Sequence, residues 1–263
     1  MIRFDLPTKQ HCDEFDGACG PRFFCVAATR RAEVGANQQL DIIGYMELQQ
    51  SLSSGSPNPM LDPAKIGFAE CGVNVIIRPT VRIIHPERIR IGSHVMIDDF
   101  VFLGAHEELV IGNHVHIGCH TSIIGGGWCY ISDFFGLSSG VRVLTGSDDF
   151  LGGGLTNPTV PADLRHVHRG RVWMGAHGGL GANSVVFPDV AIGEGSTVSA
   201  GAVVARSLAA WGVYAGNPAR RVKARPSEHI RVGEAELLSR EGPYPRSYRD
   251  APYAGLELPD AVA

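Results

Sequence analysis

Residues 174–204 read MGAHGG LGANSV VFPDVA IGEGST VSAGAV V when they are written in groups of six. An aliphatic residue or a methionine opens every group: Met174, Leu180, Val186, Ile192, Val198 and Val204. An amphipathic helix repeats its apolar face every 3.6 residues, and a half-buried strand repeats it every second residue. A stride of six predicts a solenoid instead, in which each hexad is one short strand plus a turn and three hexads make a triangular coil.

The same stride recurs upstream, so an ordinary sheet protein with chance spacing is the weaker interpretation. Two small insertions, near 104–110 and 125–127, and a bend at 85–88 interrupt it. We expect the apolar residue of each hexad to point inward and to stack on its equivalents in the neighbouring coils. The upstream positions that open hexads are the following: Val75, Val81, Ile91, Ile97, Leu103, Ile111, Ile117, Ile123, Ile131, Leu137 and Val143.

The stride stops at Thr145 and resumes at Val172, which leaves a long Gly- and Pro-containing segment between them. Loops of this length inside a regular scaffold are usually functional or disordered. Asp148, Asp149 and Phe150 give the segment a definite composition. We therefore expect an ordered active-site excursion over 145–171, with a simple turn-capping role as the alternative for the two aspartates.

Three regions follow from these patterns. Residues 1–63 form an N-terminal cap or extension with possible helices at 27–36 and 41–52; residues 64–225 form the solenoid domain; residues 226–263 form a C-terminal extension with a short helix over 228–240, interrupted by Gly233. End coils of a solenoid expose apolar surface and need capping. We expect Trp211 to pack over the last coil and close the core.

Composition excludes several classes of function. A formal net charge of -4 gives no sign of the excess positive charge with which proteins bind nucleic acid or an anionic membrane. No apolar run is long enough to span a bilayer, and the first residues lack the basic start and apolar core of a signal peptide, so we expect a cytoplasmic protein. The six cysteines show no C-x-x-C pair, which favours free thiols over a zinc site. No metal is expected.

The hexads, the excursion and the terminal Ala215-Gly216-Asn217-Pro218-Ala219 resemble the hexapeptide-repeat acyltransferases. The similar branch is that of the sugar O-acetyltransferases, which includes maltose, galactoside and polysaccharide-modifying enzymes. The resemblance covers about 44–225. It implies an all-β solenoid, a left-handed parallel β-helix, with short helical N-terminal and C-terminal extensions.

The resemblance also implies function and assembly. The donor would be acetyl-CoA, and the acceptor a hydroxyl of a sugar or of a surface-polysaccharide precursor. The family assembles as a homotrimer with active sites in the grooves between subunits. A threefold ring has its own rationale, because it is closed and buries one flat face of each subunit.

Acetyl transfer to a hydroxyl needs a general base, and histidine is the natural base near pH 7. His116 is the first candidate because it precedes Ile117 and so points outward, within an Asn113–Ile117 segment that looks recurrent in this branch. His120 and His114 are the alternatives. In the maltose and galactoside enzymes the catalytic histidine stands in a Thr-x-x-His segment where the stride breaks. Asp148 occupies that place here, so this histidine cannot be carried over.

Two pairs of aspartates stand near the candidate bases. Asp148 or Asp149 could orient the base or the acceptor. Asp98 and Asp99 point outward on an earlier coil; they could contact the acceptor, but we expect them to be merely solvated. His166 and His168 make only a weak metal motif.

The wall formed by 174–204 is the expected track for the pantetheine arm of the donor. Its small residues would let the arm lie close to the backbone; they are Gly181, Ala182, Ser199, Ala200 and Gly201. The adenine and phosphates would meet Asn217 and Pro218 together with Arg220, Arg221 and Lys223, because cations suit phosphate. The competing interpretation of the basic run is a solvated helix start.

Two alternatives remain open at this stage. Within the transferases, the acceptor could be the amino group of a nucleotide-linked amino sugar. Outside them, the chain could be a non-catalytic hexapeptide solenoid, either a scaffold or a metal-binding relative of carbonic anhydrase. The Asn-Pro-Ala ending and the Asp148–Pro161 segment favour a transferase.

Overall fold

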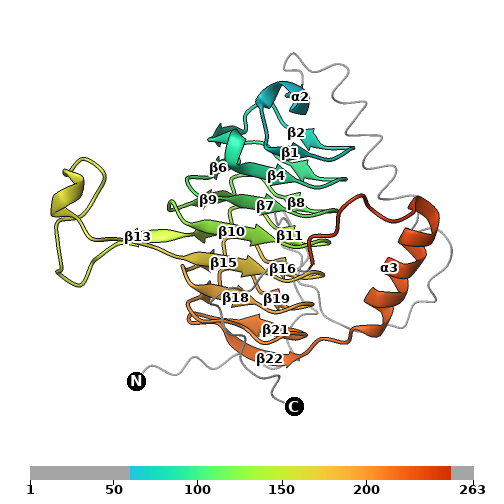
Figure 1. Ribbon diagram of the computed structural model, residues 1–263. Coiled ribbons are helices and arrows are strands. Elements are labelled where there is room, and N and C mark those ends of the chain that lie inside the picture. The colour runs from blue at the N-terminus through green and yellow to red at the C-terminus, as the bar shows by residue number, and fades with distance from the viewer. Residues whose placement is uncertain (1–59, 250–263) are drawn as a thin grey trace, which may run out of the picture. The chain divides into compact units, whose positions relative to one another are not determined.

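The computed structural model describes residues 60–249, and these residues form a parallel β-solenoid of the left-handed β-helix type (Figure 1). Each coil contributes one short strand to each of three sheets. The N-terminal helices expected at 27–36 and 41–52 lie outside the described residues. The expected fold class is confirmed for the part of the chain that can be described.

Three parallel sheets form the walls of the solenoid, and we number them in the order in which the chain meets them. Sheet 1 contains β1 (Glu70–Cys71), β4 (Ile89–Ile91), β7 (Leu109–Ile111), β10 (Trp128–Ile131), β15 (Arg171–Met174) and β18 (Val190–Ile192). Sheet 2 contains β2 (Ile76–Ile77), β5 (Met96–Ile97), β8 (His116–Ile117), β11 (Gly136–Leu137), β16 (Gly179–Leu180), β19 (Thr197–Val198), β21 (Gly212–Ala215) and β22 (Arg220–Ala224). Sheet 3 contains β3 (Arg82–Ile84), β6 (Phe102–Gly104), β9 (Ser122–Ile124), β12 (Arg142–Leu144), β17 (Val185–Val186) and β20 (Val203–Val204).

The core is the stack of hexad residues that the stride predicted. The six openers of 174–204 are all between 0% and 4% exposed. The strand register stacks them in straight columns, for example Ile117 on Leu137 and Leu137 on Leu180 in sheet 2. Burying an aliphatic side chain of this size contributes roughly 1.5–3 kcal/mol, so the columns dominate the stability of the coils.

The phase of the first coil differs from the prediction. Val75 and Val81 do not open its hexads, because the register pairs Ile77 with Ile97 and Ile83 with Leu103. Val75 and Val81 lie two residues earlier, directly before strands β2 and β3, and they also pack with the core. Apolar residues stand at both positions of each pair, so the sequence pattern could not distinguish the two phases.

The excursion between β12 and β15 is a two-stranded antiparallel ribbon, formed by β13 (Gly146–Asp148) and β14 (Val167–Arg169). A 3₁₀ helix, η2 (Ala162–Leu164), lies in the segment that joins the two strands. Figure 1 shows the ribbon extending away from the solenoid wall. A second 3₁₀ helix, η1 (Pro86–Arg88), makes the bend expected at 85–88.

Two α-helices flank the coils. Short α2 (Pro63–Ile66) precedes β1, with Asp62 accepting a hydrogen bond from the Ala64 backbone N–H. The longer α3 (Glu228–Glu241) runs through Gly233 without a break. Residues 220–224 form strand β22, so the interpretation of this basic run as a helix start is wrong.

One corner of the solenoid, between sheets 1 and 2, carries a column of residues with left-handed backbone conformation. Asn and His adopt this conformation more readily than most residues. The members of this corner column with side chains are Asn74, His94, His114, Phe134, His177 and Trp211. The rings of His94, His114, Phe134 and His177 stack on one another with centroids 4.6 to 5.1 Å apart. Gly195 also belongs to the column, and a side chain there would collide with the indole of Trp211.

Trp211 does not close the core as predicted. The last members of the core cluster are Tyr214 and Ala219, whereas Trp211 stacks against His177 and under the guanidinium of Arg231 from α3. The reason is the left-handed backbone of Trp211, which turns its side chain outward onto the corner column.

Among residues 60–249, we find no helix that is both long and apolar enough to cross a membrane.

Candidate active site

The outer face of sheet 2 carries a row of residues in direct register across its strands. Residues paired across a sheet lie on the same face of that sheet. The residues next to this row along each strand point inward and belong to the buried core. Along the sheet the row reads His116, Gly136, Gly179, Thr197, Val213 and Lys223. Five strand spacings of about 4.8 Å separate the two ends, which puts His116 about 24 Å from Lys223.

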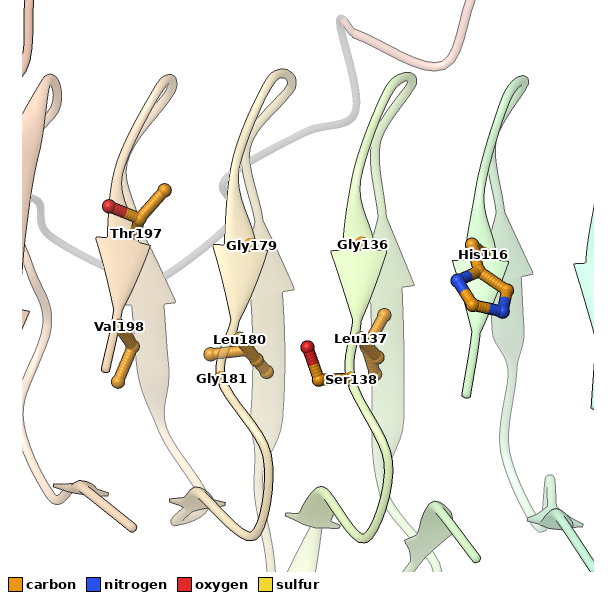
Figure 2. A pocket seen from close by; sticks show the side chains of 9 residues that line it. All are labelled: His116, Gly136, Leu137, Ser138, Gly179, Leu180, Gly181, Thr197 and Val198. Carbon is orange, nitrogen blue, oxygen red and sulfur yellow. The ribbon is translucent and has the colours of Figure 1, made fainter. Parts of the chain in front are cut away.

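The two glycines leave a hollow beside His116 (Figure 2). A Cβ at Gly136 would meet no atom within 4 Å, and a Cβ at Gly179 would make only ordinary contacts, the nearest at 3.5 Å. Neither glycine has a positive φ. The chain's own packing therefore does not demand glycine at either position, which points to space kept for something outside the chain.

An open groove of about 310 Å³ follows this hollow and is lined by the first four residues of the row, from His116 to Thr197, and by their neighbours along the strands. His116, Thr197 and Ser138 supply its polar side chains, and Gly181 supplies backbone. Ser138 directly follows β11 and is exposed. Sequence reasoning missed Ser138, although its place two residues after the outward Gly136, directly after the inward Leu137, is the signal that could have identified it.

His116 lies half-exposed at one end of the groove and is bonded to Asp98 of the preceding coil. The distance from His116 Nε2 to Asp98 Oδ2 is 2.8 Å. A carboxylate only accepts hydrogen bonds, so this contact assigns the imidazole proton to Nε2 and leaves a lone pair on Nδ1. The pair has the geometry of a general base held in one tautomer by a carboxylate.

The expectation that Asp98 and Asp99 are merely solvated is wrong. Asp98 makes the contact with His116, and its side chain is 23% exposed. Asp99 accepts a hydrogen bond of 2.6 Å from the Thr80 hydroxyl, which also accepts one from the Phe100 backbone N–H. Asp98 thus holds the candidate base in position, whereas Asp99 stabilises the turn.

His120 lies on the corner between sheets 2 and 3, beyond the groove-lining residues. Its ring stacks on that of Phe100, with centroids 4.9 Å apart and planes at 9°. Its backbone is left-handed. Among residues 60–249 no carboxylate contacts the His120 ring, so the geometry favours His116 over His120 as the base.

Asp148 and Asp149 organise the excursion ribbon. Asp148 accepts two hydrogen bonds from Arg165, at 2.7 and 3.0 Å, and one from the Asn157 backbone N–H at 2.9 Å. These contacts, with the Arg165 hydrogen bond foremost, hold the pKa of Asp148 below its usual value. Asp149 accepts hydrogen bonds from the backbone N–H groups of Leu151 and Gly153. Within one chain, neither aspartate belongs to the groove that contains His116.

The small residues proposed for the donor track fall into two groups. Gly181 lines the groove, and a Cβ there would approach the Ala200 nitrogen to 2.4 Å, so close packing of the coils requires this glycine. Ala182, Ser199, Ala200 and Gly201 lie on the turns that leave β16 and β19. They are not among the residues that line the groove.

The basic strand β22 pairs antiparallel with β21, and Asn217 and Pro218 lie in the turn between them, joined by a cis peptide bond. The register between β21 and β22 places the cations of β22 on different faces of the sheet. Lys223 pairs with Val213 and Arg220 pairs with Ala215, both outward positions. Arg221 pairs with the buried Tyr214 and so lies over the end of the coil. Only Arg220 and Lys223 therefore share the outer face with the groove.

Comparisons with known proteins indicate the class of protein to which the chain belongs. No family model matches the chain. The chain is 35% identical over 169 residues to a dTDP-4-amino-4,6-dideoxy-D-glucose acyltransferase from Escherichia coli, a match that covers 64% of this chain and 88% of the relative. It is 30% identical over 157 residues to the putative colanic acid biosynthesis acetyltransferase WcaF from Escherichia coli, covering 60% of this chain and 70% of that protein.

Solved structures similar to this chain are also acyltransferases. AntD, an N-acyltransferase from Bacillus cereus in complex with dTDP and 3-hydroxybutyryl-CoA, has 38% identity and a TM-score of 0.65, over 68% of this chain and 95% of its own. A variant of AntD in complex with dTDP-4-amino-4,6-dideoxyglucose and coenzyme A has 36% identity and a TM-score of 0.66, over 70% of this chain and 100% of its own. The chain belongs to the hexapeptide-repeat acyltransferase family.

Proposed function

We propose that this protein transfers an acyl group from acyl-CoA to the amino group of a nucleotide-linked amino sugar, in the groove on the outer face of sheet 2. The observation that carries the proposal is the row that joins a carboxylate-held histidine, two unobstructed glycines and a terminal cation. The sequence favoured O-acetylation of a sugar, with the amino sugar as the alternative. The relatives that act on a dTDP-linked amino sugar, or bind one, favour that alternative.

The donor would lie along the row with its thioester toward His116. The pantetheine arm would cross Gly136 and Gly179, where no side chain obstructs it. Its phosphates would meet Arg220 and Lys223, and guanidinium and ammonium groups both suit phosphate oxygens. Acyl-CoA complexes of the similar AntD support CoA as the carrier.

His116 would act as the general base. The acceptor nitrogen attacks the thioester carbonyl carbon, a C–N bond forms, and the nitrogen loses a proton to His116 Nδ1. The tetrahedral intermediate then collapses, the C–S bond breaks, and the CoA sulfur leaves as a thiolate that takes up the proton. Asp98 keeps Nδ1 unprotonated before the step and stabilises the imidazolium that forms during it.

Ser138 and Asp148 extend the proposed site. AntD has been crystallised with substitutions at a serine and at an aspartate that lie ten positions apart. Ser138 and Asp148 have the same separation, and Ser138 lines the groove. Ser139 and Asp149 share the spacing, but Ser139 lies outside the groove lining. We therefore assign Ser138 as a hydroxyl donor to the reacting groups and Asp148 as a contact for the acceptor.

A homotrimer would bring Asp148 to such a groove. Within one chain the ribbon leaves the coil between sheets 3 and 1, whereas His116 faces outward from sheet 2. The ribbon also carries apolar side chains that solvent would otherwise meet, with Phe150 77% and Leu151 98% exposed. A ring of three subunits gives each ribbon a neighbour's surface to cover, and it is a closed arrangement.

The test is an acyl-transfer assay with purified protein, acetyl-CoA or 3-hydroxybutyryl-CoA, and dTDP-4-amino-4,6-dideoxyglucose. Released CoA thiol is measured, and the product mass is determined. We expect product to form with wild type and to fall at least about 100-fold with His116→Ala. Thiol release that does not depend on the acceptor, or equal rates in the two proteins, would contradict the proposal.

O-acetylation of a saccharide is the second candidate, supported by the similarity to WcaF. The same assay separates the two, because an amide survives mild alkali whereas an ester is cleaved. A dTDP sugar with a hydroxyl in place of the amino group serves as the matched acceptor. Transfer to the hydroxyl sugar at a rate equal to or above that for the amino sugar would favour the second candidate.

A further inference from the structure

We propose that His94, His114 and Glu241 form a binding site for a transition-metal dication such as Zn²⁺, which ties the end of helix α3 to the corner of the solenoid. The three ligand atoms all lie within 4.8 Å of one another. Nothing in the proposed acyl transfer uses this cluster, and the sequence analysis expected no metal. The inference is independent of the proposed function.

The cluster joins distant parts of the chain. His94 and His114 occupy equivalent places on successive coils of the corner column, and their rings stack 4.6 Å apart. Glu241 is the last residue of α3. This cluster could not be predicted from the sequence, because well over a hundred residues separate the histidines from the glutamate.

The distances within the cluster are those of metal ligands rather than of hydrogen bonds. Glu241 Oε2 lies 3.5 Å from His114 Nε2 and 3.8 Å from His94 Nε2. An N–H···O hydrogen bond is normally 2.7–3.2 Å long. Ligand atoms bound tetrahedrally to Zn²⁺ at about 2.0–2.1 Å are separated by about 3.3 Å. One carboxylate oxygen is thus near both nitrogens at close to the separation that a shared ion requires.

The donor chemistry also fits. Two imidazoles and one carboxylate make a three-ligand set that zinc accepts in proteins, with the fourth position open to water. Tyr244, three residues after Glu241, has its hydroxyl hydrogen-bonded to His114 Nε2, so that hydroxyl has to release the nitrogen before His114 can bind the ion. Binding requires the stacked rings to tilt so that both Nε2 atoms converge on the ion.

The consequence of binding concerns the C-terminal segment. Residues after α3 are fixed to the same corner, where Asn113 donates a hydrogen bond of 2.8 Å to the Arg246 carbonyl and Asp133 accepts one from the Tyr248 backbone N–H at 3.2 Å. A metal at Glu241 would hold the start of this segment. It would also fix the turn that precedes His116, because His114 lies two residues before that base.

The test is a titration of tag-free, chelator-treated protein with ZnCl₂, followed by calorimetry and by thermal unfolding. We expect one Zn²⁺ per chain and a higher unfolding midpoint at saturation. His94→Gln and Glu241→Gln should each weaken binding at least about 10-fold. Glu236→Gln is the matched control, since Glu236 lies on the same helix and pairs with Arg240 instead; it should bind like wild type.

Circular dichroism in the absence of metal checks that each variant folds. Zinc binding that is equal in wild type and in both ligand variants would overturn the proposal, because the ion would then bind elsewhere. Failure of wild type to bind at 100-fold excess of Zn²⁺ over protein at micromolar concentration would overturn it as well. Neither result depends on acyl transfer, so the experiment tests the metal site independently of the proposed function.

Discussion

At the scale of single residues, the decisive features are a histidine held by a carboxylate and glycines that the fold does not need. His116 and Asp98 come from neighbouring coils, and the 2.8 Å contact between them follows from the parallel register of β5 and β8. The hexad pattern identified His116 as outward-facing. It also placed Asp98 outward but did not identify it as the partner of His116, because their contact depends on the register between two coils.

The first prediction concerns this pair. His116→Ala should lower kcat by about 100- to 10,000-fold with little change in KM for acyl-CoA, because the base acts on the acceptor. Asp98→Asn should lower kcat by about 10-fold or more, since an amide stabilises the imidazolium less well. Steady-state kinetics measure both. His106→Ala, at an exposed histidine that packs against His85, is the control. A kcat within twofold of wild type for His116→Ala would exclude this residue as the base.

The second prediction separates a chemical role of Asp148 from its structural role. Arg165→Met removes the partner but keeps the carboxylate, whereas Asp148→Asn removes the charge and keeps most hydrogen-bonding atoms. If Asp148 contacts the acceptor, Asp148→Asn should raise KM for the sugar substantially more than Arg165→Met does. Limited proteolysis of the ribbon should report similar loosening in both. Equal kinetic losses would mean that Asp148 only shapes the ribbon.

At the scale of elements, much of the architecture could be predicted and some of it could not. The six-residue stride predicts the inward columns, because aliphatic residues at every sixth position pack in a regular way only when they stack on one another inside the coils. The basic run 220–224 was ambiguous, since its antiparallel pairing with β21 depends on the turn at 216–219 and not on periodicity. The corner column also could not be predicted from the sequence, because left-handed turn positions leave no periodic apolar signal.

The third prediction concerns α3 and the corner column. His177 is buried beneath α3, and burial together with Arg249, Arg231 and Arg225 lowers its pKa to about 4. Glu234, whose Oε2 lies 3.1 Å from His177 Nε2, opposes this shift only in part, because it also pairs with Arg249. Between pH 6.5 and 4 the unfolded chain therefore binds a proton at this histidine that the folded chain does not, and stability should fall as the pH is lowered.

Thermal unfolding between pH 7 and 4 measures this effect. His177→Phe should flatten the decline of the unfolding midpoint, since phenylalanine does not titrate. The substitution suits the site, because Phe134 has the same left-handed backbone one coil away and stacks in the same column. A decline as steep as that of wild type would assign the pH dependence to other groups.

At the scale of the whole molecule, the proposed site needs a neighbouring subunit to bring Asp148 to the groove. One chain supplies His116, Ser138 and the glycine row on sheet 2, but the ribbon with Asp148 leaves by another corner (Figure 1). No single-chain pattern could reveal this, since a residue contributed by a second subunit carries no spacing relation to the first. The acceptor's identity is hidden for the same reason.

The fourth prediction is the assembly that follows. Light scattering coupled to size exclusion should give the mass of three chains at micromolar concentration. Substituting Asp for Phe150 and Leu151 together should weaken the trimer and raise KM for the acceptor, because it charges the exposed apolar ribbon. Circular dichroism should be unchanged. A monomer that retains full acyl-transfer activity would contradict the shared groove.

The fifth prediction tests the central claim, that acyl-CoA lies along the outer face of sheet 2. The measurement is calorimetric titration with CoA of wild type, Gly136→Leu and the Arg220→Ala, Lys223→Ala double variant, with Gly233→Ala on α3 as control. Wild type and the control should bind one CoA per chain. Gly136→Leu should bind at least about 10-fold more weakly, because a side chain of this size fills the hollow at no cost in packing. The double variant should weaken binding by removing the phosphate contacts. No binding at millimolar CoA, or equal affinity in all four proteins, would contradict the account.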